Sequence, residues 1–224
     1  MEIVVDNVTK TFGNTNVIET VSMELHSGCI YGLQGINGSG KTMLMRLISG
    51  LIHPTKGEIR VNGRVLKGEN SFPESMGLLI ENPSFLNSYS GCRNLEMLAS
   101  LSGKIGPEEV RKVLDRVGLG AHSGKRYGKY SLGMRQRLGI ACAIMEQPEL
   151  ILLDEPFLSL DEEAVGLVAN IIRQEKERGA LIILACHDYG LLSSASDEIF
   201  QIVGGKLAHH LIKGAQEVFS EVIQ

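Results

Sequence analysis

Short apolar runs alternate with polar positions through residues 1–66, a pattern that predicts β-strands. The pair Asn62-Gly63 separates two of these runs, and Asn-Gly is the strongest local signal for a two-residue hairpin. Inside this region, GCIYGLQG predicts a buried strand that leads through a glycine-rich turn into a helix, KTMLMRLISGL, which ends near His53-Pro54. The pattern therefore predicts a β-rich region containing one strand–loop–helix unit.

The spacing of apolar positions becomes helical between residues 87 and 129. The segment CRNLEMLASL carries apolar residues at helical spacing, namely Leu95, Leu98, Ala99 and Leu101. The segment GPEEVRKVLDRVGL opens with Pro107 and two glutamates, which favour a helix N-terminus. These residues predict a helical subdomain inserted between strands.

After residue 130, helices alternate with the apolar strands LILLDE, ALIILACH and EIFQIVGGKL, the βαβ rhythm of a parallel sheet covered on both faces. The predicted fold is α/β, with a mostly parallel sheet, an N-terminal antiparallel β region and the inserted helical subdomain. We expect one domain over residues 1–224, with a core of residues 1–86 and 130–224 and a helical subdomain of residues 87–129. The C-terminal string LIKGAQEVFSEVIQ predicts a short amphipathic helix.

Composition and charge exclude several classes of protein. A hydrophobic content of 43% supports a buried core, and no run approaches the roughly 18 apolar residues of a membrane span. The acidic start MEIVVDNVTK lacks the layout of a signal peptide, so we expect a cytoplasmic protein. A net charge of -4 without a basic block argues against nucleic acid as a partner.

The cysteines and the paired histidines give no sign of a metal site. The four cysteines lack metal-ligand spacing, so we predict that they act as small hydrophobic residues. His209 and His210 have no visible companion ligands and are predicted to be surface residues.

The string GINGSGKT, residues 35–42, satisfies G-x-x-x-x-G-K-[ST] between a predicted strand and a predicted helix. The glycines let backbone N–H groups point inward, and the helix N-terminus adds about half a positive charge. Lys41 is predicted to reach the β- and γ-phosphates, and Thr42 to offer its hydroxyl to Mg²⁺. A glycine-rich loop without a ligand is the alternative, but a lysine and a threonine at this spacing favour a P-loop NTPase core. The predicted nucleotide-binding residues here are Gly35, Asn37, Gly38, Ser39, Gly40, Lys41, Thr42 and Met43.

A second strand, in LILLDEP, ends in two carboxylates, which are costly at the end of a buried strand unless they meet a cation or a reacting water. Asp154 is predicted to hold Mg²⁺. Glu155 points differently and is predicted to polarise the attacking water. Acids that merely begin a loop are common at strand ends, so this motif alone leaves both interpretations open.

The string YSLGMRQRLGIACAIMEQPELILLDEPFLSLD, residues 130–161, resembles the signature helix, Walker B strand and D-loop of ATP-binding cassette (ABC) ATPases. The resemblance extends over nearly the whole chain. The family signature usually reads L-S-G-G-Q, and here Ser131 and Gly133 keep its serine and its second glycine. Ser131 also suits a helix N-cap, where a hydroxyl and free N–H groups form an anion site.

The resemblance implies that two copies pack head to tail around two ATP molecules, so that Ser131 and Gly133 of one copy contact the γ-phosphate held by the other. Hydrolysis then removes the bridging phosphate and lets the halves separate. Asp161 matches the D-loop aspartate, His187 matches the switch histidine at the γ-phosphate, and Phe12 matches the aromatic residue that stacks on adenine. The implied cofactors are ATP and Mg²⁺, and the implied partner is a second ATPase protomer in a homodimer.

Two further residues, outside the signature, depart from the usual family pattern. Glu81, at the end of the run MGLLIE, stands where most members have a glutamine that touches Mg²⁺ or the attacking water. It either begins a solvated loop or meets a cation, and our hypothesis is that it couples metal-bound ATP to movement of residues 87–129. Met43 follows Thr42 in place of a second hydroxyl residue, so we expect at most weaker nucleotide binding.

LIENPSF together with YSLGMRQRLGIA resembles the ATPases of lantibiotic-immunity and bacitracin-resistance exporters. This likeness implies a peripheral subunit on the inner face of the membrane that drives a separate integral membrane permease and exports antimicrobial peptides. The alternatives are a soluble ABC ATPase of a non-transport assembly and the ATPase of another transporter type. The chain has neither the coiled-coil insertion nor the second cassette of the soluble classes.

Overall fold

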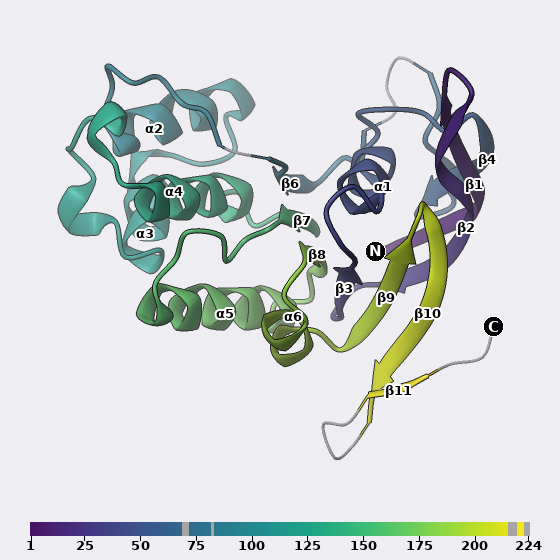
Figure 1. Ribbon diagram of the computed structural model, residues 1–224. Coiled ribbons are helices and arrows are strands. Elements are labelled where there is room, and N and C mark those ends of the chain that lie inside the picture. The colour runs from purple at the N-terminus through teal and green to yellow at the C-terminus, as the bar shows by residue number, and fades with distance from the viewer. Residues whose placement is uncertain (69–71, 82, 215–218, 222–224) are drawn as a thin grey trace.

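The antiparallel region predicted near the N-terminus forms a four-stranded sheet, on the right of Figure 1. The computed structural model describes residues 1–68, 72–81, 83–214 and 219–221, and the sheet order β2-β1-β4-β5 refers to these residues. Its strands are β1 (Glu2–Phe12), β2 (Thr15–His26), β4 (Lys56–Val61) and β5 (Arg64–Val65). Asn62 and Gly63 have φ values of 49° and 76°, and Val61 pairs with Arg64, so the predicted two-residue hairpin is confirmed.

A second sheet runs through the centre of the molecule in the order β11-β10-β9-β3-β8-β7-β6. The run from β9 to β6 is parallel, and β10 and β11 add an antiparallel edge. Its strands are β3 (Ile30–Gln34), β6 (Met76–Leu79), β7 (Leu150–Asp154), β8 (Leu181–Cys186), β9 (Glu198–Val203), β10 (Lys206–Lys213) and β11 (Phe219–Glu221). The predicted α/β fold with a mostly parallel sheet is confirmed. Because the carboxyl ends of parallel strands share one edge, the loops after β3, β7 and β8 open on the same side.

The helices are α1 (Lys41–Ile48), α2 (Gly91–Ser102), α3 (Pro107–Arg116), α4 (Leu132–Ile144), α5 (Glu162–Glu177) and α6 (Tyr189–Ala195), with 3₁₀ turns at Gly120–His122 and Tyr127–Lys129. Helices α2, α3 and α4 gather on the side away from the antiparallel sheet (Figure 1). Among the described residues, no helix combines the length and the apolar character needed to cross a bilayer.

Helix α2 buries only part of its predicted apolar face. Leu95 and Ala99 are buried, as the helical spacing predicts, whereas Leu98 is 37% exposed and Leu101 is 83% exposed. The spacing identified the helix correctly but overestimated the width of its buried stripe, since the neighbouring helix α3 covers only one side of it.

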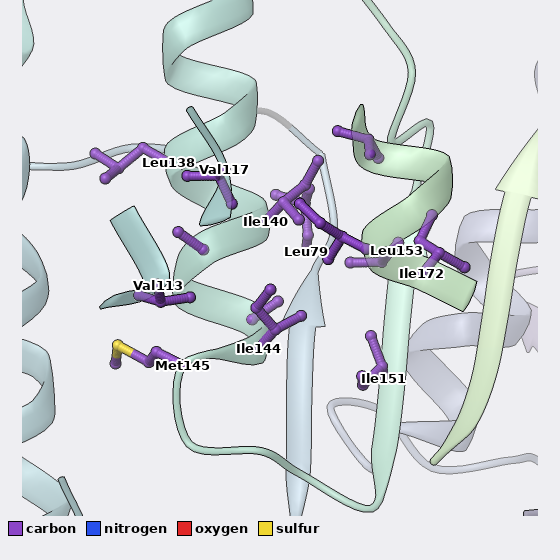
Figure 2. Packing of buried hydrophobic residues seen from close by; sticks show 14 of the residues in the cluster. Leu79, Val113, Val117, Leu138, Ile140, Ile144, Met145, Ile151, Leu153 and Ile172 are labelled. Carbon is purple, nitrogen blue, oxygen red and sulfur yellow. The ribbon is translucent and has the colours of Figure 1, made fainter. Parts of the chain in front are cut away.

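The central strands separate two apolar clusters. Along β7, Ile151 and Leu153 face one cluster, while Leu150 and Leu152 face the other. Figure 2 shows the first cluster, in which Ile140 and Ile144 of α4 pack near Leu79, Ile151 and Leu153, with Ile172 of α5 close by. The second cluster holds α1 against the antiparallel sheet. The P-loop helix α1 is therefore anchored on one face of the sheet, and the signature helix α4 on the other.

Two expectations near the C-terminus are wrong. The predicted amphipathic helix over residues 211–224 does not form in the described part, where Leu211–Lys213 belong to β10 and Phe219–Glu221 to β11; residues 215–218 and 222–224 lie outside the described residues. His210 is not a free surface residue, because its Nε2 lies 2.7 Å from Glu198 Oε2 and its ring stacks on Phe200. His209 is exposed, as expected.

Candidate functional site

The loop between β3 and α1 forms a tight backbone cradle. Gly38 and Gly40 have φ values of 80° and 114°, which disfavour any residue with a Cβ. A Cβ on Gly35 would lie 2.4 Å from both Ile202 O and Ser39 Oγ, so this position is sterically closed to larger residues. The glycines of the motif are thus required by backbone conformation and by close approach.

Lys41 and Ser39 place polar groups inside this cradle. The Lys41 side chain is largely buried, and its Nζ donates to Gly35 O at 2.6 Å and to Ile36 O at 3.2 Å. The buried Ser39 hydroxyl has no hydrogen-bond partner among the described residues. A phosphate oxygen could accept hydrogen bonds from the Lys41 ammonium group and from the unpartnered Ser39 hydroxyl.

Thr42 and Asp154 meet across the gap between α1 and the end of β7. The Thr42 hydroxyl donates to Asp154 Oδ2 at 2.6 Å. Burial raises the pKa of Asp154, and the neighbouring charges of Glu155 and Glu81 act in the same direction, while the Thr42 hydroxyl and Lys41 oppose it. A buried carboxylate with a raised pKa next to a hydroxyl fits a hard cation with oxygen ligands, so the residues present suit Mg²⁺.

Glu155 and His187 are brought together by the neighbouring strands β7 and β8. His187 Nδ1 lies 2.9 Å from Glu155 Oε2, and the His187 backbone N–H donates to Glu155 Oε1 at 3.1 Å. Glu155 has a φ of 48°, and its own N–H donates to Ala185 O at 2.8 Å. The carboxylate is therefore fixed in direction while its side chain remains 23% exposed.

Most of the glycine loop, Thr42, Asp154 and Glu155 line one open cavity of about 460 Å³, which we call the phosphate cavity. The predicted residues Gly35 and His187 line a neighbouring hollow instead. The lining of the phosphate cavity includes the predicted residues Asn37, Gly38, Ser39, Gly40, Lys41, Thr42, Met43, Asp154 and Glu155. Sequence patterns did not point to the remaining lining residues, Thr15, Asn16 and Val17 at the start of β2 and the turn Gly204-Gly205. The adjacent Gly-Gly pair was the one available signal, because a Cβ on Gly205 would lie 2.5 Å from Val17 O.

Gln136 is a further residue that the sequence did not single out. It lies in α4, is buried, and its Nε2 donates to the backbone carbonyl of Glu155 at 2.9 Å. The signature helix is thereby bonded to the residue predicted to act on water.

Ser131, Gly133 and Asp161 line a separate hollow of about 350 Å³. Ser131 caps α4, as predicted, and accepts from Met134 N at 3.2 Å, while Asp161 caps α5 and accepts from Ala164 N at 2.9 Å. A Cβ on Gly133 would lie 2.9 Å from Ser159 O, so glycine is needed there. No residue lines both this hollow and the phosphate cavity.

Glu81 lies outside the phosphate cavity. It follows β6 with a φ of 61°, and its Oε1 pairs with an amino nitrogen of Arg46 on α1. The Glu81 side chain is 64% exposed. The raised pKa of Asp154, to which Glu81 contributes, still links the two carboxylates electrostatically.

Phe12 and Met43 occupy the margins of the site. Phe12, at the end of β1, is 49% exposed, and Lys10 Nζ lies 5.0 Å from its ring centroid, but Phe12 does not line the phosphate cavity. Met43 lines that cavity and also packs against the cluster of the antiparallel sheet. The role of each toward a nucleotide stays a prediction.

Comparison with known proteins gives consistent matches. The family model described as ABC transporter matches residues 18–158. The uncharacterized ABC transporter ATP-binding protein YybJ of Bacillus subtilis is 43% identical over 201 residues, which cover 90% of this chain and 92% of that protein. The bacitracin transport ATP-binding protein BcrA of Enterococcus faecalis is 36% identical, and the match covers 95% of this chain and 69% of that protein. The lantibiotic transport ATP-binding protein SrtF of Streptococcus pyogenes is 30% identical, and the match covers 91% of this chain and 87% of that protein.

Solved structures show the same architecture. An ATP binding subunit of an ABC transporter matches with a TM-score of 0.85 at 26% identity, over 94% of this chain and 89% of that one. A dimeric ATP-binding cassette in a post-hydrolysis state, bound to ADP and Pi, matches with a TM-score of 0.84 at 19% identity, over 93% and 97%. The second likeness concerns the fold alone.

Proposed function

This chain belongs to the ABC transporter family, as an ATPase and the ATP-binding subunit of a transporter, and we propose that it dimerises around two ATP molecules to drive a separate permease that exports antimicrobial peptides. The observation that carries this proposal is the Glu155–His187 pair beside a glycine cradle containing a buried lysine. Catalysis by such a site is mostly positioning and electrostatic stabilisation, so the argument concerns which groups are held and where.

The cradle residues bind the phosphates of ATP. Backbone N–H groups of residues 35–40 and the N-terminus of α1 favour the anionic chain. Lys41 exchanges contact with the Gly35 and Ile36 carbonyls for contact with phosphate oxygens, and Ser39 gains an acceptor for its hydroxyl. Phe12 stacks on the adenine ring from the end of β1.

Thr42 and Asp154 are the residues that would hold Mg²⁺, with Glu81 as a further carboxylate near them. When bound, Mg²⁺ neutralises phosphate charge and orients the phosphates. Within this chain, the hydrogen bond from Thr42 keeps Asp154 directed at the cavity, and the packed strands leave only 7% of the residue exposed.

Glu155 orients the attacking water and accepts its proton. Its carboxylate is held by the backbone N–H and the ring of His187, and its carbonyl is held by Gln136, so the group is aimed before the nucleotide arrives. The contact with Glu155 directs Nδ1 of His187 inward and leaves Nε2 for the γ-phosphate. Preorganisation of this kind reduces the cost of orienting groups during the reaction.

A second copy supplies the other half of each site. Ser131 and Gly133 line a hollow that lies apart from the phosphate cavity of the same chain. A helix N-terminus capped by serine binds anions, and within one chain it has no phosphate to bind. A head-to-tail homodimer lets this hollow close over ATP held by the partner, with Asp161 communicating between the two sites.

The permease and the cargo are inferred from relatives whose names describe bacitracin transport and lantibiotic transport. We place the ATPase on the cytoplasmic face of the membrane, with residues 87–129 as a helical subdomain that moves against the permease. The core would then comprise residues 1–86 and 130–224. The competing proposal is an ABC ATPase of a soluble, non-transport assembly.

A trapped dimer tests the assembly and identifies the partner. Tagged Glu155→Gln protein is isolated from its native host in mild detergent with Mg-ATP, its mass is measured by light scattering, and co-purified proteins are identified by mass spectrometry. A dimer bound to a polytopic membrane protein is expected. Recovery of soluble partners alone would overturn the coupling to a permease.

The cargo is tested by deleting the gene and measuring sensitivity to bacitracin, to a lantibiotic and to a control antibiotic that acts inside the cell. We expect greater sensitivity to the peptides only, restored by the wild-type gene but not by Lys41→Ala. Unchanged sensitivity to both peptides would contradict peptide export and leave the ATPase assignment intact.

A further inference from the structure

Cys186, the last residue of β8, lies directly behind the Glu155–His187 pair and is not used in the hydrolysis described above. One ligand atom each from Glu155, Cys186 and His187 can be chosen so that all lie within 4.8 Å of one another. Across the part of the chain that the structure describes, this is the one group of three or more such side chains that close together. Sulfur, nitrogen and oxygen ligands therefore converge at one point.

We propose that Glu155, Cys186 and His187 form a binding site for a zinc-class cation, meaning a divalent transition-metal ion such as Zn²⁺ or Co²⁺. Binding of this ion blocks ATP hydrolysis. The three side chains supply thiolate, imidazole and carboxylate, the ligand types that Zn²⁺ takes in proteins. Binding is a coordination step in which Cys186 loses its proton to solvent, so the site carries two negative charges against the two positive charges of the ion.

Distances between the ligands suit a small tetrahedral ion. Zinc–sulfur bonds of about 2.3 Å and zinc–nitrogen bonds of about 2.0 Å place ligand atoms roughly 3.5 Å apart. Glu155 Oε2 and His187 Nδ1 are 2.9 Å apart, and one ligand atom from each of the three residues lies within 4.8 Å of the others, so side-chain shifts of about 1 Å complete the geometry. Three protein ligands leave a fourth position open, as in sites that bind an exchangeable ligand.

The surroundings hold the sulfur in place and leave a path for the ion. Cys186 is 2% exposed, and its sulfur lies within 4.8 Å of ligand atoms of Glu155 and His187. The His187 side chain is 54% exposed, and His187 lines a hollow of about 450 Å³ together with residues 34–39. An ion can thus reach the histidine and the glutamate first and then the thiol behind them.

Mg²⁺ and the zinc-class ion are expected at different places. Mg²⁺ prefers oxygen ligands and takes thiolate poorly, which directs it to Thr42 and Asp154. A zinc-class ion bound to Glu155 occupies the carboxylate that would accept the proton from water. The same ion also holds His187 in place. This inhibitory consequence rests on the proposed function, whereas binding of the ion does not.

Cobalt(II) is the probe for the site, because a thiolate ligand gives Co²⁺ an intense charge-transfer absorption that oxygen and nitrogen ligands lack. The full chain is titrated with Co²⁺ without nucleotide, as wild type, Cys186→Ser and Cys29→Ser. Cys29 is the matched control, because its sulfur lies 4.0 Å from Glu198, which contacts His210. We expect the absorption in wild type and in Cys29→Ser, and its loss in Cys186→Ser.

The affinity for Zn²⁺ is then measured by competition with a chromogenic chelator. Removal of one ligand, in Cys186→Ser or in the more exposed His187→Ala, is expected to weaken binding by about tenfold or more. His187→Ala keeps the test decisive if Cys186→Ser does not fold. Absence of the charge-transfer band in wild type, or its persistence in Cys186→Ser, would overturn the proposal.

Inhibition is measured as the ratio of the phosphate release rate with Zn²⁺ to the rate without Zn²⁺ at constant Mg-ATP. Each variant is compared with its own rate without Zn²⁺. We expect the Zn²⁺ concentration for half inhibition to rise about tenfold in Cys186→Ser and to stay unchanged in Cys29→Ser. Wild type that shows the cobalt band without ATPase activity would contradict the proposed function and leave the metal site standing. Normal ATPase activity without the band would contradict the metal site alone.

Discussion

Strands β6 and β7 are parallel neighbours, and each is followed by a glutamate in a left-handed backbone conformation. The last paired residues are Leu79 and Leu153, and two residues beyond each lie Glu81, with a φ of 61°, and Glu155, with a φ of 48°. The two carboxylates therefore leave the same edge of the sheet at equivalent positions. Their surroundings nevertheless differ in almost every respect.

Glu155 is held by hydrogen bonds at its N–H, its carbonyl and its carboxylate, through Ala185, Gln136 and His187. The Glu81 side chain pairs with Arg46 and is 64% exposed, against 23% for Glu155. An ion pair that is largely in water is worth about 0–1 kcal/mol. The strand end thus determines where a carboxylate emerges, and the packed neighbours determine whether it is aimed.

The largest expected difference between the two positions is in turnover. Glu155→Gln keeps the shape of the side chain but removes the base, so we expect ATP hydrolysis to fall by about 10²–10⁴-fold. Phosphate release measures this, with Glu163→Gln on the exposed face of α5 as the matched control. Rapid hydrolysis by Glu155→Gln would remove the distinction between the two glutamates.

Asp154→Asn distinguishes the role of Asp154 in binding Mg²⁺ from its effect on the stability of the fold. Removal of the charged ligand is expected to raise the Mg²⁺ concentration for half-maximal activity by about 10- to 100-fold. Burial raises the pKa of Asp154, so its charge costs the folded state free energy at neutral pH. Without metal, Asp154→Asn is therefore expected to raise the melting temperature by roughly 2–4 °C, equivalent to about 1 kcal/mol for a chain of this size.

The pH dependence of this rise in melting temperature tests whether the charge of Asp154 is its cause. The gain in melting temperature should be present above the raised pKa and absent below the pKa of an unfolded aspartate, where the carboxyl is protonated in both states. Scanning calorimetry of the metal-free protein across that range measures it. A gain that does not change with pH would mean that the charge of Asp154 is not its cause.

Gln136→Met tests whether the hydrogen bond to the Glu155 carbonyl aims the carboxylate. The buried carbonyl loses its donor while the side-chain volume is kept, at an expected cost of about 1–3 kcal/mol. The melting temperature should fall by about 2–12 °C, and turnover should fall with it. Gln174→Met on the exposed side of α5 is the control. Full activity with a lowered melting temperature would assign Gln136 a purely structural role.

Glu81→Gln is expected to give the smallest effect. Loss of the exposed pair with Arg46 should change the free energy of unfolding by less than about 1 kcal/mol. The Mg²⁺ concentration for half-maximal activity is expected to rise by about threefold, well below the change in Asp154→Asn. If both the ATPase rate and transport are unchanged, the hypothesis that Glu81 couples metal-bound ATP to residues 87–129 is wrong.

Local signals in the sequence were sufficient for much of the fold. Asn62-Gly63 predicted a hairpin because both residues tolerate positive φ, and Pro107 with the glutamates after it predicted the start of α3 because those residues suit a helix N-terminus. The end of the chain was misjudged because the apolar spacing of residues 211–224 fits a helix, whereas pairing with β9 makes Leu211–Lys213 a strand.

The sequence by itself determined the phosphate cradle, the strand-end carboxylates and the order of the motifs, because each depends on residues a few positions apart whose backbone requirements are local. Only the tertiary structure decided the partners of these groups: Arg46 for Glu81, Gln136 for Glu155, and the neighbours Cys186 and His187 beside Glu155. No spacing along the chain encodes these contacts. They arise because parallel strands bring distant residues to one edge of a sheet, where packing sets which side chains meet.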